Sequence, residues 1–305
     1  MLKKIHWWLI AACFAVSCSH PAEKNSVKIL FAGDLLLDRG VRQRIEHSNA
    51  DSLFTKIKPL FSDADFVVAN LECPVTKQVS PINKQFIFRG EPEWLTAVHD
   101  AGITHLEMAN NHTNDQGRKG IVDTYNNISQ HGMTAVGYGE NQTSACDPVI
   151  IEKNGIRVAL FSSALVPLEN WSYLPDSPGI CQASARDLEE KIRSHKAELN
   201  NDYIVVILHW GIEFQTSPML SQRIQAQALI DAGADAIIGV HPHVIQDRMT
   251  YKGKPIYFSI GNFVFDQDYP GSEALVVELK FTDDGMKFSD HEIKIVNCLP
   301  EVANN

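Results

Sequence analysis

The sequence predicts an α/β protein whose strands and helices are stacked in layers with mixed sheets. Short apolar runs that are typical of buried strands alternate with longer segments whose apolar residues recur at helical spacing. This alternation indicates βαβ units in a layered fold. Near the C-terminus, hairpin-like segments with glycine turns follow one another instead. We therefore expect the sheets to be mixed and not purely parallel.

Six apolar runs predict the buried strands, and four amphipathic segments predict the helices. The strands are expected at residues 27–31, 66–69, 103–108, 157–162, 203–208 and 236–240. The helices are expected at residues 91–102, 117–132, 184–199 and 217–233. The first of these helices has Pro92 in its first turn and Gly102 just past its end, which is the usual asymmetry of helix termini. The hairpin-like segments are residues 249–265, 273–288 and 290–297.

The composition is that of a soluble globular protein with a large core. Of the 305 residues, 44% are hydrophobic and 21% are charged. The 37 acidic residues outnumber the 27 basic ones, so the formal net charge is −10. We expect no nucleic-acid partner, because phosphate backbones require basic patches on the protein. An anionic small substrate remains compatible with this charge, because a bound metal ion can supply local positive charge.

The N-terminus predicts an exported lipoprotein. Two lysines precede an apolar stretch that is too short to span a membrane, which is typical of a secretory signal. Small residues lie directly before Cys18, as in a bacterial lipobox. We therefore expect residues 1–18 to be a signal peptide and Cys18 to be lipidated, with ordinary signal-peptidase cleavage as the alternative. The expected location is outside the cytoplasm, on a membrane.

One domain is expected after the export segment. Residues 19–26 read as a polar tether, and residues 27–298 contain no linker-like change of composition and no internal repeat. Four of the six cysteines lie in this part of the chain, namely Cys73, Cys146, Cys181 and Cys298. Their spacing matches no CxxC metal pattern, and a disulfide and buried free thiols both remain open, because the pairing cannot be deduced from sequence.

Metal-capable side chains stand where five of the apolar runs end. In chain order they are Asp34, Glu72, Asn111 followed by His112, His209, and His241 with His243. In open α/β sheets, ligands bind beyond the carboxyl ends of the strands. A single histidine at a strand end is usually a packing residue, but five such ends together predict one binding site.

The types of side chain at these ends favour a transition metal. Carboxylates, an amide and imidazoles suit Mn, Zn or Fe better than Ca or Mg, which prefer oxygen ligands. The absence of CxxC pairs favours an open catalytic site over a closed structural zinc. Carboxylates can bridge two cations about 3.5–4 Å apart, and such a pair can generate a hydroxide nucleophile for a phosphoryl or carbonyl centre. We therefore expect one or two divalent ions as the cofactor.

The ordered series GD, NLE, NNH, H and HPH resembles the metal-binding motifs of the calcineurin-like metallophosphoesterases. More closely, the chain is similar to the CapA family of poly-γ-glutamate capsule synthesis. The matching segments are FAGDLLLDRG, VVANLECPVT, FIFRGEPEWLTAVHDAGITHLEMANNHTNDQG, ILHWGIEF, ALIDAGADAIIGVHPHVIQD and KPIYFSIGNFVFD. They span roughly residues 27 to 268. The resemblance implies a four-layer α/β/β/α sandwich.

The resemblance also implies roles for the strand-end residues. Glu72 would bridge two metals. The other ligands would divide into two sets, with Asn111, His209 and His241 on one metal and Asp34 and His243 on the other. His112 would be the catalytic proton donor or the group that stabilises an oxyanion, since an imidazole beside a metal-bound substrate can do either.

Two motifs depart from the phosphoesterase pattern. Leu36 stands where a DxH motif would have its histidine, and Glu72 stands in an NLE setting where phosphoesterases have Asp in GDxxD. The metal at Asp34 therefore lacks a ligand, for which Asp38 is a candidate substitute. Accordingly, we expect the loss of His241 to reduce metal binding more than the loss of His243.

Further residues within the matched segments are candidates for the site. Arg39, Arg89 and Asn262 are candidate substrate-binding residues, because arginine suits bidentate recognition of carboxylate or phosphate. The alternatives are surface ion pairs for the arginines and a turn cap for the asparagine. Glu213 and Asp115 could orient a histidine, although a surface role for Glu213 and a turn role for Asp115 are favoured.

Three functions remain open at this stage. The expected one is a cell-envelope protein of capsule or poly-γ-glutamate synthesis or export, whose metal site acts as a metal-dependent hydrolase. The alternatives are a metal-dependent phosphoesterase of the envelope and a lipid-anchored scaffold that binds polymer at a degenerate site without turnover. The expected partners are an anionic polymer or its precursor, the membrane through the lipid anchor, and other capsule-synthesis proteins.

Overall fold

The computed structural model describes residues 25–199 and 203–303. The predicted signal peptide, the lipidation site at Cys18 and nearly all of the predicted tether lie outside these described residues. Across the described ranges, no helix is both long enough and apolar enough to cross a membrane.

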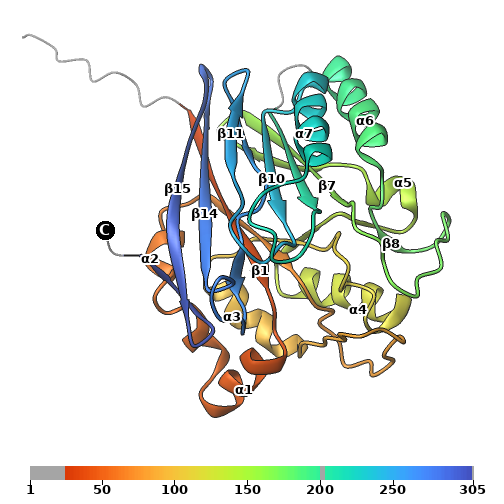
Figure 1. Cartoon of the computed structure of the whole chain (residues 1–305), viewed down its shortest axis with the longest axis vertical. Coiled ribbons are helices and arrows are strands. Elements are labelled where there is room, and N and C mark those ends of the chain that lie inside the picture. Colours follow the sequence, from red (N-terminus) through yellow and green to blue (C-terminus); the bar gives the residue numbers. More distant parts are fainter. Residues whose placement is uncertain (1–24, 200–202, 304–305) are drawn as a thin grey trace, which may run out of the picture.

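Two large sheets form the centre of the molecule (Figure 1). In spatial order, the first sheet consists of β16 (Leu299–Val302), β15 (Gly285–Val296), β14 (Glu273–Thr282), β1 (Ser26–Leu35), β2 (Phe66–Leu71), β3 (His105–Glu107) and β4 (Thr134–Val136), with β13 (Asn262–Val264) also paired to β1. The second consists of β11 (Arg248–Tyr251), β12 (Lys254–Tyr257), β10 (Ala236–Val240), β9 (Tyr203–His209), β7 (Ile156–Ala164) and β6 (Val149–Lys153). A small separate ribbon pairs β5 (Tyr138–Gly139) with β8 (Gly179–Ile180).

Both large sheets are mixed, which confirms the prediction. In the first sheet, β1 to β4 are parallel, whereas β14, β15 and β16 are antiparallel to their neighbours. In the second sheet, β7, β9, β10 and β12 are parallel and the edge strands β6 and β11 are antiparallel. All six predicted buried strands are present, as β1, β2, β3, β7, β9 and β10.

The two sheets pack face to face over an apolar cluster. This cluster includes Val27, Ile29 and Phe31 of β1 together with Val205 and Ile207 of β9. Leu30 of β1 and Val206 of β9 lie between these residues along the strands and belong to a second apolar cluster, under the helices. Because both faces of these strands are buried, their sequences read as continuous apolar runs and do not alternate with polar residues.

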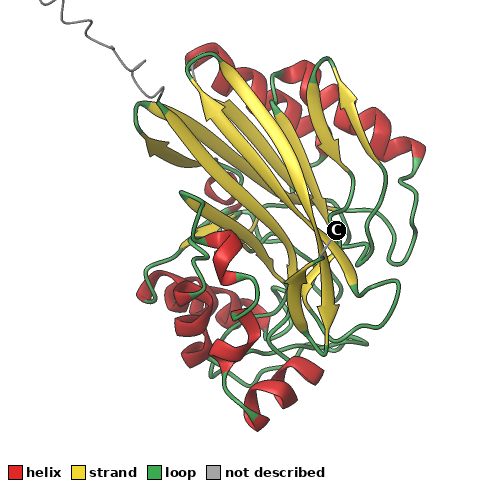
Figure 2. Cartoon of the chain, turned by 90° about the vertical axis from the view of Figure 1, so that its left-hand side faces the viewer, coloured by secondary structure: helices red, strands yellow, loops and turns green. Residues whose placement is uncertain are grey.

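Helices cover the outer faces of both sheets, so the molecule has the expected four-layer α/β/β/α order (Figures 1 and 2). Over the second sheet lie α6 (Ala185–Glu198) and α7 (Leu220–Ala232), and on the side of the first sheet lie α1 (Arg39–His47), α2 (Lys58–Phe61), α3 (Leu95–Asp100) and α4 (Gly117–Gln130). Shorter elements are η1 (Ala50–Phe54), η2 (Pro92–Trp94) and α5 (Gln142–Ala145).

Two parts of the chain differ from the predicted elements. The sequence analysis did not predict α1, because only Val41 and Ile45 of that helix are buried and the apolar pattern is too sparse. The segment 249–265 does not form a single hairpin. Its first half is the β11–β12 hairpin, but its end crosses to the other sheet as β13 and pairs in parallel with β1.

One disulfide joins two of the four cysteines whose pairing the sequence left open. Cys146, at the end of α5, is bonded to Cys181, directly after β8, and the bond closes a segment of 35 residues. Cys73 is a buried free thiol and Cys298 a half-buried one.

Removing this disulfide should weaken the fold measurably. We expect the C146A/C181A double variant to lose about 2–4 kcal/mol of unfolding free energy, because the cross-link no longer restricts the unfolded chain. Urea denaturation at pH 7 would measure this loss. The control is C298A, which keeps the cross-link and should change the stability by less than about 1 kcal/mol. A double variant as stable as C298A would contradict the prediction.

Candidate metal centre

The carboxyl ends of the central strands meet at one edge of the two sheets. In the first sheet, Asp34 of β1 pairs with Asn70 of β2 on one side and with Asn262 of β13 on the other. In the second sheet, His209 at the end of β9 lies beside the residue that precedes His241. Parallel neighbours bring their ends to the same edge, which is where α/β proteins place their ligands.

The HPH segment leaves β10 through an unusual turn. His241 and His243 both have left-handed backbone conformations, with φ angles of 98° and 60°. Each such conformation costs a non-glycine residue about 1–2 kcal/mol. Residues in such conformations are concentrated at functional sites, where the surrounding structure holds them in place.

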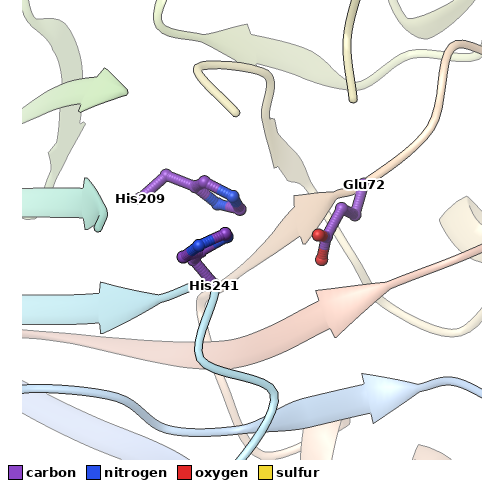
Figure 3. A group of neighbouring side chains, drawn as sticks. All are labelled: Glu72, His209 and His241. Carbon is purple, nitrogen blue, oxygen red and sulfur yellow. The ribbon is translucent and has the colours of Figure 1, made fainter. Parts of the chain in front are cut away.

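The turn directs the two imidazoles into two overlapping groups of potential ligands. The His209 group consists of Glu72, His209 and His241, and the Asp34 group consists of Asp34, Glu72 and His243. Within each group, the ligand atoms lie within 4.8 Å of one another, and all these residues are buried. Figure 3 shows the two rings of the His209 group and the Glu72 carboxylate turned toward one another. Glu72 belongs to both groups, as a bridging ligand would.

The chemistry of the His209 group fits a cation. Both carboxylate oxygens of Glu72 and the Nδ1 atom of His241 are buried without a hydrogen-bond partner. Burial, together with the nearby charges of Asp34 and Glu213, raises the pKa of Glu72 well above its usual value. A buried carboxylate without a partner is costly, and a divalent ion would supply the missing partner.

The histidines of this group are in the protonation state that binds metals. Burial, with the neighbouring histidines, lowers the pKa of His209 well below its usual value and the pKa of His241 to about 3. Both rings are therefore neutral at pH 7, which is the form that ligates a metal. Asn111 lies beside them, with its Oδ1 atom 2.7 Å from Nε2 of His209. The amide oxygen of Asn111 is thus placed to be a fourth donor.

The Asp34 group is arranged differently. The Nδ1 atom of His243 lies 3.2 Å from Oδ2 of Asp34 and 3.0 Å from Oδ1 of Asn262, and its Nε2 atom lies 3.6 Å from Oε1 of Glu72. Burial alone lowers the pKa of His243, but the hydrogen bond and charge of Asp34 outweigh it, so the pKa is raised. A metal ion at this group therefore competes with a proton for His243. Leu36 offers no ligand atom and is buried in the apolar core.

Asp38 does not substitute for that ligand. Its Oδ1 atom accepts a hydrogen bond from Nε of Arg42 at 2.8 Å, and its Oδ2 atom accepts one from the backbone N–H of Arg89 at 2.8 Å. The suggestion made from the sequence is wrong because α1 begins just after Asp38 and turns its carboxylate toward Arg42.

The three candidate substrate-binding residues already have partners in the protein. Arg39 forms an ion pair with Asp266 at 3.0 Å, and Arg89 forms one with Glu91 at 2.6 Å. Asn262 is completely buried and accepts or donates hydrogen bonds within the protein only, among the described residues. The arginines thus form the ion pairs that the sequence left as the alternative, and Asn262 contacts the site through His243.

Two buried amides that the sequence analysis did not single out connect the two groups. The side-chain N–H of Asn70 donates to Oδ1 of Asp34 at 2.7 Å and lies 3.4 Å from Nδ1 of His209. The amide of Asn110 in turn donates to Oδ1 of Asn70 at 2.9 Å. Both residues lie inside the matched NLE and NNH segments, which was the only signal available in the sequence.

His112 directly follows Asn111 in the chain and has its own partner. Its Nδ1 atom is 2.8 Å from Oδ2 of Asp115, and its ring stacks on Phe88 with the centroids 4.2 Å apart. Asp115 therefore contacts the imidazole directly, whereas the sequence analysis favoured a turn role. Glu213 is exposed, as favoured, but is close enough to influence the pKa of Glu72.

A second buried carboxyl lies near these residues. Glu107 of β3 accepts a hydrogen bond from the hydroxyl of Ser162 at 2.6 Å through Oε1, while its Oε2 atom has no partner. Burial raises the pKa of Glu107 to about 8. The folded protein therefore keeps a proton on Glu107 that the unfolded chain releases near pH 4.5.

In metal-free protein, the stability contributed by Glu107 should fall between about pH 4.5 and 8, since a raised carboxyl pKa stabilises the fold only while the proton stays bound. The contribution of Glu107 should be at most about 1.4 kcal/mol per pH unit. E107Q should remove it and flatten the pH dependence, as measured by urea denaturation in chelator. The control E152Q changes an exposed glutamate of β6 and should keep the wild-type slope. Parallel curves for E107Q and wild type would refute this.

Known proteins resemble this chain over most of its length. It is 32% identical over 275 residues to the capsule biosynthesis protein CapA of Bacillus anthracis, which covers 88% of this chain and 67% of that protein. It is 34% identical over 242 residues to the PGA biosynthesis protein CapA of Bacillus subtilis (strain 168), covering 78% and 63%. The chain thus spans about two thirds of the length of these relatives.

Solved structures resemble it in fold. A hypothetical protein from Thermus thermophilus has a TM-score of 0.56 at 15% identity, covering 88% of this chain and 99% of that one. The NAD nucleotidase of Haemophilus influenzae has a TM-score of 0.56 at 10% identity, covering 93% and 61%. At these identities the likeness shows the fold alone, and it is the calcineurin-like metallophosphoesterase fold that the motifs implied.

The family model described as "Bacterial capsule synthesis protein PGA_cap" matches residues 28–267. This match includes every strand-end residue of the candidate metal centre. Together with the two Bacillus relatives, it shows that the chain belongs to the CapA family of bacterial capsule synthesis proteins.

Proposed function

We propose that this protein acts in the cell envelope in capsule or polyglutamate synthesis or export, as a metal-dependent hydrolase. The observation that carries the proposal is Glu72, a fully buried carboxylate without a hydrogen-bond partner that belongs to both groups of potential ligands. We further propose that residues 27–298 form the CapA-like domain, and that residues 1–18 are a signal peptide ending at Cys18, which becomes the lipidated residue.

In this proposal, one or two divalent ions of Mn, Zn or Fe bind at the site. The His209 group with Asn111 would hold the tighter ion, and the Asp34 group would hold the weaker one. Bound there, such ions would act as Lewis acids and lower the pKa of water. The protein supplies a water-poor setting for this chemistry, because the ligand residues of both groups are buried.

His112 is the residue that we propose moves a proton. Its Nδ1 atom faces Asp115 at 2.8 Å, so the carboxylate favours the tautomer that carries its proton on Nδ1. Nε2 is then the nitrogen available to exchange a proton with a substrate held at Asn111. The stacking on Phe88 fixes the plane of the ring.

An anionic polymer or its precursor is the proposed substrate class. The names of the Bacillus relatives refer to capsule and PGA biosynthesis, which supports this class without establishing it for the present chain. Arg39 is the candidate cation for such an anion, because its side chain is 39% exposed; the anion would have to share a guanidinium that Asp266 already holds through Nε and Nη2. Other capsule-synthesis proteins and a membrane anchor belong to the same proposal.

A non-catalytic scaffold is the second candidate. The observation that favours it is Leu36, whose apolar side chain occupies the position of a metal-ligating histidine and leaves the Asp34 group with three members. Such a protein would bind polymer through one ion and would not turn it over.

The two histidines of HPH should differ in their effect on metal retention. We expect H241A to lose the tighter ion, because it removes one donor from the His209 group, whereas H243A should keep about one ion per protein. Elemental analysis after dialysis against low metal would measure both. Equal retention by the two variants would sink the assignment of the tighter ion to the His209 group.

If the protein is a hydrolase, the metal-loaded wild type should cleave a substrate, and the rate of cleavage should depend on His112. With Mn, Zn or Fe added, the wild type should cleave either a phosphoester or a γ-glutamyl peptide, and H112N should lower that rate about 10²–10⁴-fold with unchanged metal content. H99N serves as the control, since His99 is half exposed and lies in α3 away from the ligands. If the metal-loaded wild type cleaves neither substrate class, the hydrolase proposal is wrong and the non-catalytic scaffold is favoured.

A further inference from the structure

Lys84 has a buried side chain within a mostly exposed stretch, residues 77–86. It lies between β2 and η2, and its neighbours Asn83, Gln85 and Phe86 are all exposed. The side chain of Lys84 is only 1% exposed. Burying an ammonium group is costly unless partners compensate it, so its contacts should explain why it points inward.

Those contacts are all made to one short segment. The Nζ atom of Lys84 lies 2.7 Å from the main-chain carbonyl oxygen of Asn111, 2.7 Å from Oδ1 of Asp115 and 3.4 Å from Nδ1 of His112. This segment carries the proposed amide ligand and the proposed proton donor. Lys84 therefore connects an exposed loop to two members of the site at once.

Asp115 depends on this ammonium for its charge balance. The carboxylate is completely buried, and its Oδ2 atom accepts hydrogen bonds from the backbone N–H of Phe88 at 2.7 Å and from His112 at 2.8 Å. The contact of Oδ1 with Lys84 has the distance of an ion pair but not the angles of a regular hydrogen bond. Without Lys84, Asp115 would be a buried charge with no cation, and breaking such pairs is strongly destabilising locally.

The main-chain contact acts on the ligand itself. Asn111 places its Oδ1 atom 2.7 Å from Nε2 of His209, so the direction of the amide depends on how the backbone of Asn111 is held. The carbonyl of that same residue accepts a hydrogen bond from Lys84. The contact thus restrains the ligand through its main chain, outside the set of proposed metal ligands.

We propose that Lys84 is a positioning residue of the metal centre, holding Asn111 and the Asp115–His112 pair so that the His209 group with Asn111 binds its ion tightly. The inference rests on the proposed metal site and adds to it a residue outside the ligand set. It acts on one group only, since the polar contacts of its side chain with described residues are all made to the segment 111–115.

The test separates the two ligand groups. In an H243A background only the His209 group remains, and K84M should weaken Mn²⁺ binding about 10–100-fold, the usual effect of losing a residue that orients a ligand. In an H209A background only the Asp34 group remains, and K84M should change the affinity less than about threefold. Calorimetric titration with MnCl₂ alone gives both values.

Two further variants serve as controls. K77M removes an exposed lysine of the same loop, which pairs with Glu91 and Glu93, and should leave both affinities unchanged. K84R keeps the positive charge and should recover most of the affinity lost in K84M. Thermal melting of each variant verifies that it is folded at the titration temperature.

The outcomes distinguish this inference from the proposed function. If neither wild type nor H243A binds Mn²⁺, the metal site itself fails. If H243A binds the ion and K84M weakens it no more than K77M does, the role of Lys84 is wrong. An equal loss in both backgrounds also overturns it, because that pattern indicates a general loss of structure and not the positioning of Asn111.

Discussion

The burial of the Glu72 carboxylate is the constraint on which the rest of the site depends. A carboxylate in this position, with Asp34 nearby and no hydrogen-bond donor, favours its neutral form until a cation arrives. The neighbouring histidines are held neutral by the same burial, so the residues that would bind the cation are ready to do so. A low-dielectric interior thus keeps protons off His209 and His241 and leaves these two imidazoles in the form that binds a metal ion.

The two stacked sheets make that burial possible. Each sheet contributes some of the ligands at its carboxyl edge, and neither sheet could enclose them alone. The chain also crosses between the sheets at β13, which brings Asn262 beside Asp34. From this position the Oδ1 atom of Asn262 contacts Nδ1 of His243. The left-handed turns at His241 and His243 then direct both imidazoles inward, a conformation that the surrounding packing must maintain.

Around the ligands, a set of buried polar contacts fixes their directions. Asn70 and Asn110 connect Asp34 to the NNH segment, and Lys84 holds the other side of that segment. Membership in the CapA family places the chain among capsule synthesis proteins. The chemistry of the site is consistent with a role on an anionic polymer, since ions in these groups would offset the acidic surroundings. The two groups differ in their potential donors, four with Asn111 against three, and under the proposed function this asymmetry would favour one tightly bound ion over two.

The sequence by itself determined the layered α/β class, the six central strands and the strand-end residues. These follow from the local spacing of apolar residues and from the apolar runs that precede the potential ligands. It did not determine α1, whose two buried apolar residues are too few to identify a helix, or the crossing of β13, which depends on pairing with a strand far away in the chain. The roles of Asp38 and Asp115 were also misjudged, because each carboxylate is held in part by a backbone N–H from residues 88–89. Only the tertiary structure decided which cysteines pair, which group each histidine joins, and that Lys84 is buried. Each of these depends on contacts between residues distant in sequence, and no local pattern records such contacts.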